Sequence, residues 1–274
     1  MNNLAHVLDN QGKYAEAEQM HRQTLKLKEA VLGKRHPDTF DSMNNLAEAL
    51  RSQGKYAEAE QMHRQILKLR EAVLGKEHPD TLASINNVAV VLHNQGKYAE
   101  AEQIHRQTLE LREAVLGKKH PDTLASMNNV ANVLHNQGKY AEAEQMHRQT
   151  LKLREAVLGS KHPDTFASMN NLVVVLDSQG KYEDTEQMHR QTLKLREAVL
   201  GSEHPETFRS INNLAEALRN QGKYEEAEQM HRQTLELREA VLGREHPDTL
   251  ASMNNLAGVL RNQGKYEEAE QLFR

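Results

Sequence analysis

Histidine is the residue in this sequence with the widest chemical scope, because it can ligate a metal ion or exchange a proton near neutral pH. The chain has fifteen histidines. Six recur at an expected helix packing position and six precede a proline: His21, His63, His105, His147, His189 and His231, and His36, His78, His120, His162, His204 and His246. No His-Glu-x-x-His motif is present, and the lack of cysteine removes thiolate ligands. The sequence therefore predicts no metal site, and it leaves His6, His93 and His135 as ligand contacts or as residues without a function.

Motifs for phosphate binding and for nucleophilic catalysis are also missing from the sequence. The Gly-Lys pairs follow Asn-Gln, Ser-Gln or Val-Leu, and none has the spaced glycine of a P-loop before it. Ser42, Ser84 and their equivalents fall inside a predicted helix, with no neighbouring base and acid to activate them. We therefore expect no enzymatic activity and no cofactor.

The charge distribution narrows the choice of partner. Thirty-five basic and thirty-nine acidic residues give a net charge of −4, with both signs interspersed along the chain. This argues against a nucleic-acid surface and against a polybasic membrane anchor. No apolar stretch approaches the length that spans a bilayer, and the first residues do not resemble a secretory leader. We expect a cytoplasmic protein that binds neither nucleic acid nor membrane.

The sequence repeats itself every 42 residues. The tripeptide Gly-Lys-Tyr begins at Gly12, Gly54, Gly96, Gly138, Gly180, Gly222 and Gly264, and His-Pro and Asn-Asn recur in the same frame. A fixed period of this size indicates stacked units that bury their faces only against neighbours. We expect one array over residues 1–274, with repeats at 1–36 (partial), 37–78, 79–120, 121–162, 163–204, 205–246 and 247–274 (partial).

Each repeat reads as two helices. Pro79 suits a first helical turn because its missing N–H costs nothing there, and the helix A that it begins runs to about Asn94. Gly96 can adopt the left-handed conformation that ends a helix, and helix B then runs from about Tyr98 to Gly117. Helix A carries one apolar stripe whereas helix B is apolar over a wider arc, which favours an open solenoid over a closed bundle.

The repeat resembles the tetratricopeptide pattern. In the second repeat the matching residues are Met43, Leu46-Ala47, Leu50, Ala59, His63 and Pro79, with Met, Ala and His in place of the usual Trp, Gly and aromatic residue. The long period, with Asn-Asn-Leu-Ala and Leu-Gly-x-x-His-Pro-Asp-Thr, is similar to the repeats of kinesin light chains and of NOD-like signalling proteins. The resemblance implies an all-α fold, a right-handed α-solenoid of antiparallel helix pairs, and a concave helix-A face that binds peptides.

Differences between repeats concentrate on one face of helix A, opposite its apolar stripe, at the positions of Asp41, Glu48, Arg51 and Ser52. The same arc holds an unchanging asparagine, whose amide both donates and accepts hydrogen bonds and so suits gripping a peptide backbone. The predicted peptide-binding residues are Asn44, Asn86, Asn128, Asn170, Asn212, Asn254, Glu48, Arg51, Val90, His93, Asn132, His135, Val174, Asp177, Glu216, Arg219 and Arg261. Val90 and Val174 make the middle repeats more apolar, so we predict a ligand with an apolar centre and charged ends.

Other interpretations of this pattern remain open at this point. The constant asparagine can instead bond its counterpart one repeat along, and the variable face can reflect neutral drift. The second asparagine, Asn45 and its equivalents, is expected to brace the stack. As alternatives to a binding scaffold for a protein or extended peptide, the array can be the ligand-sensing region of a NOD-like signalling ATPase, or a designed or recently amplified scaffold without a native ligand. The chain looks incomplete at both ends, and uncapped terminal repeats predict end-to-end self-association.

Overall fold

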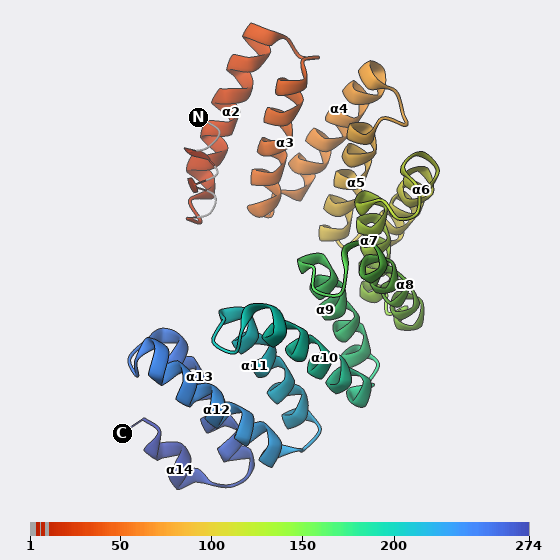
Figure 1. Ribbon diagram of the computed structural model, residues 1–274. Helices are drawn as coiled ribbons and strands as arrows, with labels where there is room; N and C mark the ends of the chain where they lie inside the picture. The colour runs from red at the N-terminus through yellow and green to blue at the C-terminus, as the bar shows by residue number, and fades with distance from the viewer. Residues whose placement is uncertain (1–3, 6, 9–10, 274) are drawn as a thin grey trace. The chain divides into compact units, whose positions relative to one another are not determined.

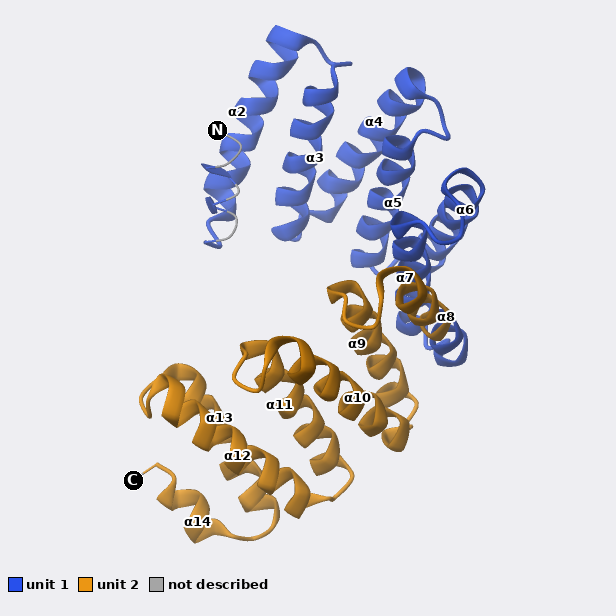
Figure 2. Cartoon of the chain, in the orientation of Figure 1, with its two compact units in different colours: residues 1–146 blue, residues 147–274 orange. Residues whose placement is uncertain are grey.

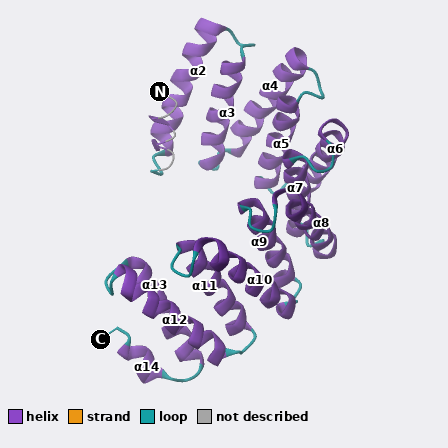
Figure 3. Ribbon diagram, viewed as in Figure 1, coloured by secondary structure: helices purple, strands orange, loops and turns teal. Residues whose placement is uncertain are grey.

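The computed structural model describes residues 4–5, 7–8 and 11–273 of the chain; His6 lies outside them. The described residues form thirteen helices and no strand (Figures 1 and 3). Six helices of 19 residues are α2 (Tyr14–Leu32), α4 (Tyr56–Leu74), α6 (Tyr98–Leu116), α8 (Tyr140–Leu158), α10 (Tyr182–Leu200) and α12 (Tyr224–Leu242). Six helices of 16 residues are α3 (Pro37–Ser52), α5 (Pro79–Asn94), α7 (Pro121–Asn136), α9 (Pro163–Ser178), α11 (Pro205–Asn220) and α13 (Pro247–Asn262), and α14 (Tyr266–Gln271) is shorter. No helix in this part of the chain is both long enough and apolar enough to cross a membrane.

The chain divides into two compact units, which are described separately (Figure 2). Unit 1 comprises residues 1–146 and unit 2 comprises residues 147–274. In unit 1 each helix from α2 to α7 packs on the next helix along the chain, and in unit 2 the same holds from α9 to α14. The prediction of an all-helical fold of stacked helix pairs is confirmed.

Helix A begins where its sequence favours a start. Pro121 occupies the first turn of α7, and the Nδ1 atom of His120 accepts a hydrogen bond of 3.2 Å from the backbone N–H of Asp122. The same cap is present at α3, α5, α9, α11 and α13. Histidine before the proline is thus a helix cap, a role that its sequence position does not reveal. A side-chain cap of this kind satisfies one of the N–H groups that a helix leaves unpaired.

Glycine ends both helices of a repeat. Gly96 has φ +78° in the turn between α5 and α6, as the sequence predicts. Gly117 has φ +88° and donates its N–H to the carbonyl of Glu113 at 3.1 Å, which closes α6. Residues other than glycine rarely adopt such φ values.

The core of each unit is a chain of small apolar clusters that join neighbouring repeats. One cluster contains Leu46 and Leu50 of α3, Ala59 of α4 and Val91 of α5, all buried. The next contains the equivalent residues of α5 and α6 together with Val133 of α7. Since each cluster includes a residue from a neighbouring repeat, apolar burial stabilises the stacking of repeats as well as the helix pair.

A buried arginine on helix B fastens the following helix A. Arg112 is 6% exposed, and its Nη1 donates to the carbonyl of Asp122 at 2.9 Å and to the hydroxyl of Ser126 at 2.8 Å. The same pair of bonds is made by Arg70, Arg154, Arg196 and Arg238, while Lys28 makes only the first. Burial lowers the pKa of Arg112, and the charge of Asp122 opposes that shift.

A glutamate on the outer side of helix B links two repeats through its charge. Glu102 accepts from Arg106 at 2.8 Å and from Lys139 of the next repeat at 2.9 Å. Burial alone would raise the pKa of Glu102, but the hydrogen bonds from Lys139, Arg106 and Gln137 outweigh it and lower the pKa to about 2. Glu18 and Glu228 have equivalent partners, and the pKa of each is likewise lowered to about 2.

Candidate functional site

The predicted binding residues lie on helix A as expected, but their exposure differs between the units. In unit 1 the residues at the positions of Glu48 and Arg51 are half-buried. In unit 2 most of their counterparts are exposed, and Val174 is 52% exposed. The half-buried residues are Asn44, Glu48, Arg51, Asn86, Val90, His93, Asn128, Asn132, His135, Asn170, Asn212 and Arg219, and the exposed ones are Val174, Asp177, Glu216, Asn254 and Arg261.

In unit 1 the constant asparagines are joined from repeat to repeat. Asn87 Nδ2 donates to Asn44 Oδ1 at 3.0 Å, and Asn129 Nδ2 donates to Asn86 Oδ1 at 2.8 Å. The bond therefore runs from the second asparagine of one repeat to the first asparagine of the repeat before it. The second asparagine braces the stack at these two steps, and the carbonyl of the first asparagine is occupied there.

Charged residues on the face pair with one another. Arg51 donates to Glu48 at 2.8 Å, and Glu48 also lies 3.4 Å from Nε2 of the buried His63. Burial raises the pKa of Glu48, but the hydrogen bonds with His63 and Arg51 outweigh this effect and lower it. Arg219 and Glu216 form the equivalent pair in unit 2. Part of the predicted charge is thus neutralised within the face.

His93 and His135, the histidines of unit 1 that lie at variable helix-A positions, both contact the side chain of Asn136. The amide of Asn136 contacts Nε2 of His93 and lies 3.2 Å, through its Oδ1, from Nδ1 of His135. Each histidine ring also lies against the tyrosine that begins the following helix, with centroids 5.4 Å apart for His93 and Tyr98. Within the part of the chain that the structure describes, no three His, Asp or Glu side chains are grouped so as to hold a metal ion.

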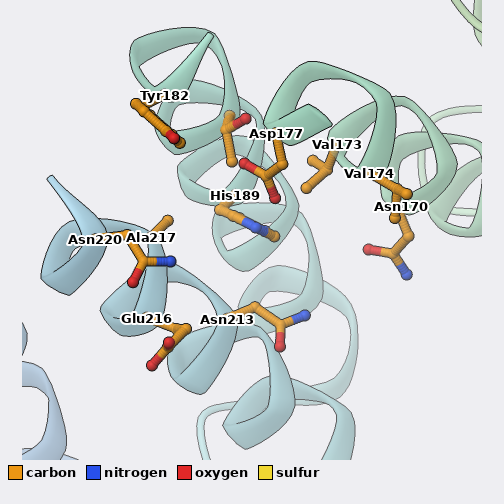
Figure 4. A pocket seen from close by; sticks show the side chains of 11 residues that line it. Asn170, Val173, Val174, Asp177, Tyr182, His189, Asn213, Glu216, Ala217 and Asn220 are labelled. Carbon is orange, nitrogen blue, oxygen red and sulfur yellow. The ribbon is translucent and has the colours of Figure 1, made fainter. Parts of the chain in front are cut away.

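Unit 2 contains an open cleft of about 280 Å³ on the helix-A face (Figure 4). Four of its residues are predicted binding residues: Asn170, Val174 and Asp177 of α9 and Glu216 of α11. Helix α10 contributes Tyr182, Thr185 and His189, and the rest of the lining is Val173, Asn213, Ala217 and Asn220. In Figure 4 the His189 side chain lies between the residues of α9 and those of α11. We call this site the unit-2 cleft.

Some polar groups of the unit-2 cleft are not paired within the described part of the chain. No hydrogen bond joins Asn170 to Asn213 in the described part of unit 2, in contrast to the equivalent pairs of unit 1. Thr185 is 1% exposed, and its hydroxyl has no hydrogen-bond partner among the described residues. His189 is buried, which lowers the pKa of its imidazole, although the charge of Asp177 acts in the opposite direction. The cleft therefore presents amides, a hydroxyl and the carboxylates of Asp177 and Glu216 beside apolar side chains.

Sequence reasoning placed the variable residues but missed those contributed by helix B. It assigned His189 to packing, and the side chain is indeed 8% exposed, yet it also lines the cleft. Thr185 and Val173 are buried and lie away from the outward face of helix A, where most differences between repeats fall. A signal was available, since both residues replace an alanine that the other repeats keep.

The helix-B side has clefts of a different character. One, of about 480 Å³ on α4, is lined by Glu60, Arg64, Lys68 and three smaller or uncharged residues. Arg64 donates to Glu60 at 2.8 Å, and Lys97 donates to the same carboxylate at 3.3 Å. These charges serve the contacts between repeats, and they recur with little change along the chain.

Comparison with known proteins agrees with the geometry. The tetratricopeptide repeat profile matches residues 1–72, 40–114, 80–156, 124–198, 164–240 and 206–274. No curated protein gives a significant match. A crystal structure of the nearly identical TPR-like repeats assigned to a kinesin light chain of Podosopora anserina is 26% identical, with a TM-score of 0.67, over 76% of this chain and 98% of that chain.

Two more distant structures share the fold. BtubC (BKLC) from P. vanneervenii is 18% identical, with a TM-score of 0.66, over 86% of this chain and 92% of that chain. A Signal Transduction ATPase with Numerous Domains from Pyrococcus horikoshii, described with a tetratricopeptide repeat sensor, is 13% identical, with a TM-score of 0.66, over 96% of this chain and 38% of that chain. Repeats of this type are generally non-catalytic scaffolds for protein–protein interaction. With matches from end to end and kinesin light chain-like structural neighbours, the chain belongs to the tetratricopeptide repeat family.

Proposed function

We propose that the chain binds an extended segment of a partner protein along its helix-A face and performs no chemistry of its own. The observation that most supports this proposal is the unit-2 cleft, where four predicted binding residues lie together. The cleft is open, so a peptide can pass through it with its side chains directed between α9 and α11. Extended peptides are commonly held in this way, by hydrogen bonds to the backbone and by pockets for some side chains.

The polar groups of the cleft suit a peptide backbone. Asn170, Asn213 and Asn220 each carry a donor and an acceptor, and a peptide bond offers the complementary pair. Burying these amides against a partner without such bonds would be costly, so the cleft favours a ligand rich in hydrogen-bonding groups. Repeats with a different set of variable residues would then read different side chains of the same segment.

A peptide-library pull-down tests this proposal. The full chain is compared with an Asn86→Ala/Asn128→Ala/Asn170→Ala variant, and we expect the variant to retain at most about a tenth of the bound peptide, since each lost hydrogen bond costs ~1 kcal/mol. The matched control is Gln107→Ala/Gln149→Ala/Gln191→Ala, which removes three exposed amides from helix B of the same repeats. Thermal unfolding of all three proteins verifies that they fold.

The two variants distinguish binding on the helix-A face from binding on helix B. Loss of binding in the asparagine variant alone supports the helix-A face. Equal binding by the parent and both variants, or loss only in the glutamine variant, would show that the helix-A face is not the binding surface. If no peptide binds to the parent chain, the proposed function itself is wrong.

The role of a sensor in a larger signalling ATPase is a second hypothesis. The Pyrococcus horikoshii protein has a tetratricopeptide sensor of similar fold, but at 13% identity the likeness shows the fold alone. A nucleotide-binding domain encoded in the same polypeptide would favour this hypothesis, as would peptide binding that changes nucleotide hydrolysis by that polypeptide. A scaffold without a native ligand would fail the pull-down.

A further inference from the structure

We propose that the unit-2 cleft binds the side chain of an arginine or lysine of the partner segment. This inference rests on the proposed function, because it names the side chain that one repeat reads. It follows from the residues by which the repeat at 163–204 differs from all others, from an unpartnered hydroxyl, and from the charge of the cleft.

Two substitutions in this repeat fall outside the variable positions of helix A. Thr185 occupies a position that is alanine in every other repeat, and so does Val173. In other repeats the helix-B alanine belongs to the apolar core, as Ala59 and Ala101 do. Both substituted residues line the unit-2 cleft. Two changes at otherwise constant positions that line the same cleft favour selection for what the cleft binds over neutral drift.

The hydroxyl of Thr185 needs a partner that the described part of the chain does not provide. It is buried without a hydrogen bond, which is unfavourable in a folded protein. A hydroxyl can accept a hydrogen bond as well as donate one, and guanidinium and ammonium groups are donors only. A basic side chain in the cleft would therefore satisfy this oxygen.

The charges around the cleft favour a cation. Asp177 forms no ion pair with any described residue. The same position carries Asp9 in the first repeat and Arg51, His93, His135, Arg219 and Arg261 in the others. Glu216 also lines the cleft, although Arg219 contacts it from the same helix. Burial lowers the pKa of His189, which favours its neutral form, although the charge of Asp177 opposes this shift. The carboxylates thus outweigh the one nearby arginine, and an anionic side chain would be repelled.

The remaining walls suit the aliphatic part of such a side chain. Val173 and Val174 offer methyl groups, and Tyr182 offers an aromatic ring that can also attract a cation. The volume of about 280 Å³ leaves room for a long, unbranched side chain and some water. This also changes the hypothesis of an apolar ligand centre, because Val174 would contact the stem of a charged residue.

The test uses two small probes of the same shape and different charge. N-acetyl-arginine N-methylamide and N-acetyl-citrulline N-methylamide are titrated separately into the full chain carrying labelled valine methyl groups. The spectra of Val173→Ala and Val174→Ala identify the two resonances. We expect both resonances to shift with the arginine probe, and we expect the citrulline probe to bind at least tenfold more weakly, because it lacks the charge that strengthens hydrogen bonds to carboxylates.

Two variants make the test specific. Asp177→Asn should weaken binding of the arginine probe by about tenfold, whereas Asp41→Asn, an exposed acid in unit 1, should leave it unchanged. Thr185→Ala restores the residue of the other repeats, so it should unfold at the same or a higher temperature than the parent while binding the probe about fivefold more weakly. A residue with only a structural role would not separate stability from binding in this way.

The inference is overturned if neither valine resonance shifts with the arginine probe, if both probes bind equally, or if Asp177→Asn binds like the parent. These results are independent of the peptide pull-down, since the probes need no partner protein. A successful pull-down with a failed probe titration would leave the proposed function in place and remove the basic side chain from it.

Discussion

The buried histidines of helix B should make the array sensitive to mild acid. His105 and His231 are 2% and 3% exposed. Burial is the main cause that lowers the pKa of each to about 4, and positive charges assist: His93 and Arg112 at His105, and Arg219 at His231. Both imidazoles are therefore neutral in the folded protein at pH values where they are protonated in the unfolded chain.

The sign and size of the effect follow from proton linkage. The ordinary histidine pKa is 6.5. The stability that these two neutral histidines contribute is therefore fully present above pH 6.5 and is lost as the pH falls from 6.5 toward 4. At pH 5 each histidine should cost ~2 kcal/mol, and the two together ~4 kcal/mol. This is a large part of the 5–15 kcal/mol that typically stabilises a folded protein, to within order of magnitude. The glutamates with a lowered pKa affect stability only below about pH 4.5, where they become protonated in the unfolded chain. At pH 5 the loss of stability therefore comes mainly from the histidines.

Urea unfolding at pH 7 and at pH 5, followed by far-UV circular dichroism, measures the effect. The variant His105→Phe/His231→Phe places the aromatic residue usual for the family at both positions and cannot be protonated; His105→Gln/His231→Gln is the alternative if phenylalanine does not fit. We expect either variant to lose ~4 kcal/mol less than the parent between the two pH values.

Thr108→Val is the control for the histidine variants. It removes the hydrogen bond of 2.8 Å from a buried hydroxyl to the carbonyl of Ile104 but adds or removes no charge. It should lower stability equally at both pH values. If the histidine variants lose as much stability as the parent on acidification, burial of neutral imidazole is not the cause and the reasoning is refuted.

Two further predictions concern contacts between repeats. Arg112→Met should lower the free energy of unfolding by ~2–4 kcal/mol, because it removes two hydrogen bonds of a buried arginine. Arg112→Lys should lower it by less, because a lysine can keep the bond to the backbone carbonyl, as Lys28 does in its own repeat. Urea unfolding of both variants measures the difference. In the same measurement, Asn129→Ala should lower the free energy of unfolding by ~1 kcal/mol and Asn213→Ala by much less. Of these two asparagines, Asn129 alone donates a hydrogen bond to the preceding repeat. Equal losses in the two variants would contradict a stabilising role for this bond.

The helices could be predicted from the sequence because their signals are local. Pro79 and Gly96 mark where α5 begins and where its following turn lies, and the structure agrees to within a residue. The bonds from the buried arginine of helix B to the following helix A could not be predicted in this way. Arg112 reaches residues ten and fourteen positions along the chain, and such distances follow from how one helix pair leans on the next rather than from the period of either helix.

The candidate site shows the same division. Asp177 and Val174 stood out because they change between repeats on an outward face. Thr185 and His189 lie on helix B beneath them, and their place in the cleft depends on packing between helices. The bond between Asn129 and Asn86 depends on the exact offset between repeats, so sequence alone identified both amides without showing which pairs would meet.

The glutamate that joins Arg106 and Lys139 has a consequence for how such a chain can change over generations. Every repeat carries both halves of this contact, so the end of any repeat fits the start of any other. An in-frame gain or loss of one repeat by recombination between these near-identical segments would create no new kind of junction. The array can therefore be lengthened, shortened or reordered while it remains foldable, and each rearrangement would present the variable faces in a new sequence.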